Sequence, residues 1–168
     1  MATIIIGWEV AGDVQLRRAF TNLPRAFDNL REPLRKFGDE VIYPATREQF
    51  AKEGKPRWPA LSPAYAARKA KVAPGAKILH LTGALEESLT DKAAADALYR
   101  LDNLELEIGS GLMVGDGRWN LALIHYKPER SDLPARRMMR LDEDAQTKGV
   151  MIFHDWLSAQ GRKEGIGL

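Results

Sequence analysis

Residues 23–44, LPRAFDNLREPLRKFGDEVIYP, carry the pattern that decides the predicted fold. Apolar residues recur there at spacings of four and three, which gathers them on one face of a helix: Leu23, Phe27, Leu30, Leu34, Phe37 and Val41. The pattern predicts that residues 14–53 are mostly helical. An apolar stripe of this kind usually packs into a core, and a coiled-coil surface is the alternative interpretation.

Three prolines interrupt this predicted helix. Pro24 suits the first turn of a new helix, which Asn22 would cap. Pro33 and Pro44 lie inside the apolar pattern. Because proline has no backbone N–H and its ring clashes with the preceding turn, each is expected to kink the helix or to divide it.

Strands are predicted on both sides of the long helix. Alternation of apolar and polar residues, or a short run bounded by turn residues, predicts strands at 3–10, 97–101, 104–109 and 136–141. The link Asp102-Asn103 would join the middle two in a tight hairpin. The glycine-rich stretch 109–117 is predicted to be a flexible loop.

Shorter helices are predicted from their capping residues. Ser62, followed by a proline, would cap a helix to about Lys71, and Thr82 would cap a second one over 83–89. Asp142 would cap a final helix to about Ser158. Residues 119–126 are predicted as one more short helix from their apolar character.

This order of elements predicts an α+β protein. We expect a small, mostly antiparallel sheet packed against the long, proline-interrupted N-terminal helix, with short helices and long loops. One domain is predicted over residues 1–160, followed by a loose C-terminal tail at 161–168.

The composition excludes several classes of protein. The 168 residues include no cysteine, which rules out disulfides, cysteine-ligated zinc and thiol catalysis. A net charge of +2 is too small by itself to indicate binding to nucleic acid or to a membrane. No apolar run reaches the length of about 18 residues that a transmembrane helix needs, and residues 1–12 lack the features of a signal peptide.

The residue types that usually carry catalysis form no recognised pattern. His80, His125 and His154 are too far apart for a local metal motif, and we expect them to be structural. The glycines of 109–117 lack the spacing and the lysine of a phosphate-binding loop. No serine has the context of a nucleophile elbow. The sequence therefore predicts a protein that is not an enzyme and that binds no cofactor and no metal.

Charged residues are distributed in blocks. Residues 55–82 carry six basic side chains and no acidic one, whereas residues 83–116 carry two basic and eight acidic ones. Three interpretations remain open: an ordinary solvated surface, two complementary patches that meet between neighbouring subunits, or a basic wall that faces DNA. The candidates for an interface or a DNA-facing role are Lys55, Arg57, Arg68, Lys69, Lys71 and Lys77.

Trp58 and three arginines are further candidates. Trp58 lies in a proline-rich loop, which suits either a rigid aromatic anchor at a subunit interface or a plug in the core. Arg136, Arg137 and Arg140 form a second cationic group, in which Arg137 would lie on the opposite face of a strand from the other two. Arg136 is expected to pair with an acidic group, inside the subunit or across an interface.

Four motifs occur in a fixed order along the chain. They are RWPALSPAYAARK at 57–69, ILHLTGALEESL at 78–89, LALIHY at 121–126 and LPARRMMRL at 133–141. In this order they resemble the phage virion morphogenesis family, the tail completion proteins of Mu-like and related tailed phages. The resemblance covers nearly the whole chain. The sequence departs from the family pattern at Met138, where phenylalanine is common, and in the stretch 109–132.

The resemblance implies a structural, non-enzymatic virion protein at the neck or the tail end. Such a protein would act in the host cytoplasm as the tail is completed and joined to the head, and no membrane partner is implied. The expected partners are further copies of the chain in a ring, most simply a hexamer, together with tail tube or sheath proteins and head-side connector proteins. A DNA-binding module that acts in genome packaging or passage is the alternative. The motif residues that are implied to be structural are Ser62, Thr82, Gly83, His125, Pro134 and Arg136.

Overall fold

The computed structural model describes residues 26–126 and 133–163 and shows an α+β fold, as the sequence predicts. The predicted strand at 3–10 and the first part of the predicted long helix lie outside the described residues. The described elements in chain order are η1 (Ala26–Asp28), α2 (Arg31–Phe37), η2 (Gly38–Ile42), α3 (Tyr43–Ala51), α4 (Pro63–Val72), α5 (Ala84–Thr90), β1 (Ala97–Leu101), β2 (Leu106–Ser110), β3 (Met113–Val114), β4 (Trp119–Asn120), α6 (Leu121–Tyr126) and α7 (Glu143–Lys163).

The predicted long helix begins anew at Arg31, two residues before Pro33, and it is not divided at Pro44: residues 31–51 are continuously helical, with a π-helical segment before that proline. Pro33 lies in the first turn of α2, and Pro44 lies at the start of α3, directly after the π-helical segment η2. The N–H of Tyr43 donates to the carbonyl of Gly38, five residues back. Pro44 has no N–H to offer the Glu40 carbonyl, and the ammonium of Lys148 on α7 donates to that carbonyl at 2.9 Å. The missing backbone donor is thus replaced by a side chain from another helix.

The apolar stripe packs into a core, which decides between its two interpretations. Phe37, Val41, Ile42 and Tyr43 are buried together with Ile108 of β2. Phe153 of α7 meets the Phe37 ring edge to face, with ring centroids 6.0 Å apart. Gly149 lets α7 come this close, because a Cβ at that position would lie 2.5 Å from the Phe37 ring.

The hairpin β1–β2 is antiparallel, with Leu101 opposite Leu106. The predicted two-residue link is therefore wrong: the turn spans Asp102–Glu105, and it is closed by the Asp102 N–H, which donates to the Glu105 carbonyl at 2.9 Å. Leu104, predicted at the start of a strand, lies in this turn and is 63% exposed. The favoured two-residue links need positive φ at one or both of their residues, and none of residues 102–105 has positive φ.

A second antiparallel pair, β3–β4, was not predicted: β3 lies inside the predicted loop at 109–117, and β4 lies at the start of the predicted helix at 119–126. Gly115, Asp116 and Gly117 all have positive φ and form the turn between the two strands. The glycines that suggested flexibility are thus hairpin residues. Trp119 belongs to β4, so α6 begins later than predicted, at Leu121, and the side chain of Asn120 caps it by accepting from the Leu123 N–H at 2.9 Å.

The C-terminal part contains one confirmed prediction and two corrections. Asp142 caps α7, since its carboxylate accepts from the Ala145 N–H at 3.1 Å. The predicted strand at 136–141 is irregular chain: among the described residues its one backbone–backbone bond to another segment runs from the Arg136 N–H to the His125 carbonyl at 2.8 Å. The helix α7 continues to Lys163 with Gly161 buried, so residues 161–163 are not part of a loose tail.

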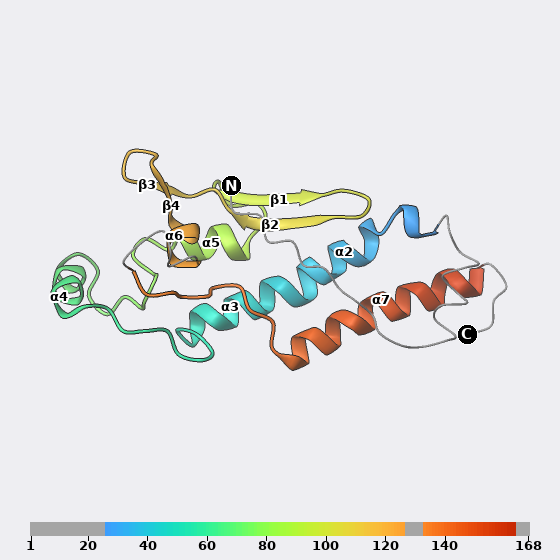
Figure 1. The fold of residues 1–168 in the computed structure, drawn as a ribbon, viewed down its shortest axis with the longest axis horizontal. Helices are drawn as coiled ribbons and strands as arrows, with labels where there is room; N and C mark the ends of the chain where they lie inside the picture. The colour runs from blue at the N-terminus through green and yellow to red at the C-terminus, as the bar shows by residue number, and fades with distance from the viewer. Residues whose placement is uncertain (1–25, 127–132, 164–168) are drawn as a thin grey trace.

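Figure 1 shows how these elements surround the core. The segments α2, η2 and α3 form one rod, with α7 along one side and the β1–β2 hairpin over α2 on the other. The short helices α5 and α6 pack against β2, and α4 lies apart from the other elements at one end. Among the helices of the described part, none is long and apolar enough to cross a membrane.

Candidate interaction surface

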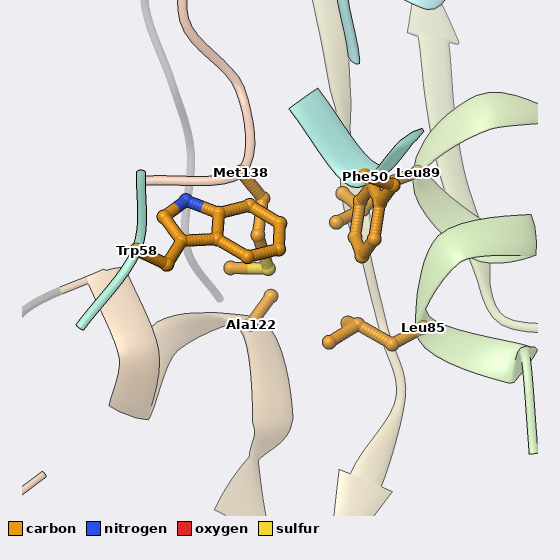
Figure 2. Close-up of a cluster of buried hydrophobic side chains, with 6 residues drawn as sticks. All are labelled: Phe50, Trp58, Leu85, Leu89, Ala122 and Met138. Carbon is orange, nitrogen blue, oxygen red and sulfur yellow. The ribbon is translucent and has the colours of Figure 1, made fainter. Parts of the chain in front are cut away.

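Trp58 is a core residue. Its side chain is 6% exposed and belongs to a buried cluster with Phe50, Leu85, Leu89, Ala122 and Met138. Figure 2 shows the indole facing Phe50 across this cluster; the two rings meet nearly perpendicular, at 83° and 5.5 Å between centroids. The indole N–H donates to the Arg137 carbonyl at 3.1 Å. Of the two interpretations of Trp58, the structure therefore supports the plug in the core.

A tight turn after α3 delivers Trp58 to this cluster. Gly54 has φ +95°, and its N–H donates to the Gln49 carbonyl at 2.8 Å. The Trp58 N–H then donates to the Glu53 carbonyl at 2.7 Å. A Cβ on Gly54 would lie 2.5 Å from the indole Cδ1, so the turn and the indole fit together only around a glycine.

Arg136 binds backbone carbonyls instead of the acidic group that the sequence predicts. Its side chain is 3% exposed, and its guanidinium donates twice to the Pro59 carbonyl, at 2.9 and 3.1 Å, and once to the Ala60 carbonyl at 3.2 Å. Burial lowers the pKa of Arg136. The two carbonyls lie in a proline-containing loop that has few N–H donors of its own, and the planar guanidinium satisfies both. Pro134, two residues earlier, is exposed.

The side chain of His125 is a buried neutral ring, and its backbone carbonyl accepts from the Arg136 N–H. Its Nδ1 is buried and has no hydrogen-bond partner in the part of the chain that the structure describes. Burial, and then the positive charge of Arg136, lower the pKa of His125 from 6.5 to about 4. The ring is therefore uncharged at neutral pH.

This burial predicts a pH dependence of stability. The free energy of unfolding is expected to rise between pH 4 and pH 6.5, because only the unfolded chain binds a proton at His125 in that window. The contribution is on the order of 3 kcal/mol. Urea unfolding across this range should show it in the native chain and not in His125→Gln. His154→Gln is the control, because His154 is exposed on α7. Equal pH profiles for His125→Gln and the native chain would contradict the assignment.

The helix α4 presents most of its side chains to solvent. Ser62 caps it, accepting from the Tyr65 N–H at 3.4 Å, as predicted from the sequence. Arg68 lies over the ring of Tyr65, 5.6 Å from its centroid. Lys71 is exposed as well. The cations of α4 that can meet a partner are therefore Arg68 and Lys71.

Lys69 lies in the same basic stretch of sequence as Arg68 and Lys71, but it is not one of the exposed cations of α4. Its side chain is 6% exposed, and its ammonium donates to the Lys77 carbonyl. Burial lowers the pKa of Lys69. The side chain turns inward toward the loop after α4, where the Lys77 carbonyl accepts both from Lys69 and from the His80 N–H at 3.1 Å. Lys69 thus ties α4 to that loop instead of facing a partner.

Lys69→Met is expected to loosen α4 where Lys71→Met does not. The substitution removes the bond from a charged donor that ties α4 to the following loop, which costs about 1–2 kcal/mol of local stability. Trypsin should then cut after Arg68 severalfold faster in Lys69→Met than in the native chain. Lys71→Met is the matched control. If both variants are cut at the same rate, the Lys69 bond does not hold the helix.

The remaining cations of the 55–82 block are exposed and partly paired. Lys55 meets Asp142 at 2.9 Å and lowers the pKa of that carboxyl. Arg57 meets Glu53 at 3.2 Å, and the ammonium of Lys77 donates to the Ala51 carbonyl at 3.1 Å. These are exposed pairs that water screens, so the side chains remain accessible to a partner.

The motif around Thr82 and Gly83 forms the start of α5. Thr82 is not the cap that the sequence predicts, because Gly83 takes the N-cap position with φ +90°. Thr82 Oγ1 accepts from the Ala84 N–H at 3.3 Å just before the helix. Nearby, His80 Nδ1 lies 2.9 Å from a Glu86 carboxylate oxygen, beside an open cleft of about 570 Å³. Among residues 26–126 and 133–163, no group of three or more His, Cys, Asp or Glu side chains is arranged to hold a metal ion.

Sequence reasoning missed the contacts between distant segments. Phe50 lies outside the apolar stripe and yet packs on Trp58. Arg137 and Arg140 come to face Lys55 and Arg57 across a hollow of about 230 Å³. About 80 residues separate the two arginines from the other two cations, and no pattern in the sequence indicates that they meet.

The described residues thus form an α+β protein that presents an exposed cationic helix and a cationic hollow. A comparison with protein families places it among phage proteins: residues 12–158 match the model of the phage virion morphogenesis family. The chain belongs to that family, as its motifs indicate. No curated protein and no solved structure matches it. Family membership gives the chain a structural role in the assembly of a phage virion.

Proposed function

We propose that this protein is a structural component of the head–tail junction, where it completes the tail and allows it to join the head. Membership of the virion morphogenesis family carries the proposal. The surface of α4 supports it, because an end helix with exposed Arg68 and Lys71 is suited to contacts with neighbouring proteins.

In this proposal the protein works as a homo-oligomeric ring of six copies in the neck. The block at 55–82 is basic and the block at 83–116 is acidic, so a ring in which one block meets the other would be electrostatically complementary. Tail tube or sheath proteins would bind one face of the ring, and head-side connector proteins would bind the other.

A DNA-binding role in genome packaging or passage is the second candidate. The exposed cations Arg57, Arg68 and Lys71 favour it, since scattered lysine and arginine side chains attract phosphate without reading sequence. The two roles predict different particles when the protein is missing.

Electron microscopy of a phage that carries a nonsense mutation in this gene separates the two roles. We expect filled heads and separate tails to accumulate, and a plasmid copy of the gene to restore joined particles. Empty heads would indicate the packaging role instead. Normal infectious particles would refute both roles.

The same complementation assay tests the surface of α4. The double variant Arg68→Glu, Lys71→Glu is expected to lower the yield of joined particles at least tenfold while the protein stays folded. The control is Arg35→Glu, Lys36→Glu, which changes the net charge equally on exposed residues of α2. Equal yields from the two double variants would show that α4 is not a contact surface.

A further inference from the structure

The cationic hollow combines an apolar wall with an excess of positive charge. The exposed Pro56 and Pro59 supply apolar surface beside the buried Trp58, and no carboxylate of the described residues lines the hollow. Four cations surround it: Lys55, Arg57, Arg137 and Arg140.

The four cations differ in their partners. Lys55 and Arg57 are each paired with a carboxylate of the same chain. Arg140 reaches only the Lys55 carbonyl, at 3.4 Å. The guanidinium of Arg137 has no partner among the residues that the structure describes. Within the described part of the chain, the positive charge at the hollow is therefore not fully neutralised, which favours an anionic group from outside.

The β1–β2 turn is complementary to the hollow, because it offers an exposed apolar side chain beside a negative charge. Leu104 is 63% exposed at its tip. The neighbouring Glu105 is exposed, and its carboxylate has no partner within the described ranges, whereas the Asp102 carboxylate is paired with Arg100 at 3.0 Å. An exposed leucine beside an unpaired carboxylate matches a hollow that offers apolar surface beside an unpaired arginine.

We propose that the hollow receives the β1–β2 turn of a second copy of this chain, with Leu104 against Pro56 and Pro59 and the Glu105 carboxylate on Arg137. This inference rests on the self-association in the proposed function and names the surfaces that would meet.

The positions of the two surfaces suit a closed ring. In Figure 1 the β1–β2 turn lies near one end of the rod, and the chain that follows α3 lies at the other. An interface between two different surfaces repeats from copy to copy and gives a ring when the rotation closes. A hollow of about 230 Å³ accommodates a side chain and part of a turn. A duplex, by contrast, presents mainly its rows of charged phosphates, which have no use for the apolar surface of the hollow, so the observations favour protein over DNA.

Cysteine cross-linking in complemented phage particles tests the pairing without background from the chain itself, which has no cysteine. Leu104→Cys and Ala135→Cys place thiols on the turn and in the hollow and leave every charge in place. Coexpressed single variants are expected to give a disulfide-linked dimer, and the double variant a ladder of multimers. Leu104→Cys with Met151→Cys, which places the second thiol on the exposed face of α7, is the control. Pro59→Cys offers a second position in the hollow if Ala135→Cys does not fold.

Charge exchange adds a second test of the same contact. Arg137→Glu in the Ala135→Cys chain is expected to reduce the dimer at least fivefold, and Glu105→Arg in the Leu104→Cys partner to restore it. Particles that contain the protein but show no dimer above the control would overturn this inference and leave the proposed function standing. An unchanged cross-link together with weaker retention of Arg137→Glu on DNA-cellulose would overturn it as well, in favour of DNA in the hollow. Particles that assemble normally without the protein would refute the proposed function itself.

Discussion

Replacing Trp58 with alanine is expected to lower the free energy of unfolding by about 3–5 kcal/mol, enough to leave much of the chain unfolded. The substitution empties the centre of the cluster in Figure 2 and removes the edge contact with Phe50. It also leaves the Arg137 carbonyl without its indole donor. Urea unfolding followed by far-ultraviolet circular dichroism gives the measurement, because that signal does not depend on the tryptophan.

Trp119→Ala is the matched control for this prediction. Trp119 is 53% exposed on β4, so removing it is expected to change the free energy of unfolding by about 1 kcal/mol or less. If the two substitutions lower the free energy of unfolding equally, or if Trp58→Ala lowers it by less than about 1 kcal/mol, then Trp58 is not the centre of the core.

Gly54→Ala is expected to cost about 3 kcal/mol or more, although it adds only one methyl group. The new Cβ would lie 2.5 Å from the indole and 2.7 Å from the Pro56 carbonyl oxygen, so both the turn and the indole must move. Alanine at φ +95° is strained even before this clash. The midpoint of urea unfolding should fall accordingly.

Gly75→Ala separates the strain from the clash. Gly75 also has positive φ, at +74°, but nothing lies within 4 Å of the position where its Cβ would be. Gly75→Ala should therefore lower the free energy of unfolding only by the strain of a left-handed backbone, about 1–2 kcal/mol. Equal losses for the two variants would mean that the close approach of Trp58 to Gly54 is relieved without cost.

Local patterns in the sequence predicted local structure well. The stripe through Phe37 and Val41 faces the core, and Ser62 and Asp142 cap the helices that follow them. These predictions depend only on residues within a few positions of each other, where helix geometry fixes what can meet.

Side chains whose partners are distant in sequence were predicted less well. A lysine in a basic stretch usually faces solvent, yet Lys69 is buried because the following loop returns a carbonyl to it. Arg136 was expected to need an acid, and its partners are two carbonyls more than 70 residues away. Identifying either partner requires the path of the chain between the two segments. The turn of β1–β2 was misjudged for another reason, because Leu104 is apolar and yet lies at an exposed tip.

Lys148 and Gly149, neighbours on α7, both meet the rod at one place. The lysine occupies the carbonyl that Pro44 leaves free, and the glycine provides the notch into which the Phe37 ring fits. Sliding α7 along the rod by one turn would break the first contact and drive a side chain into Phe37. The two contacts therefore fix the lengthwise register of α7 on the rod at this point.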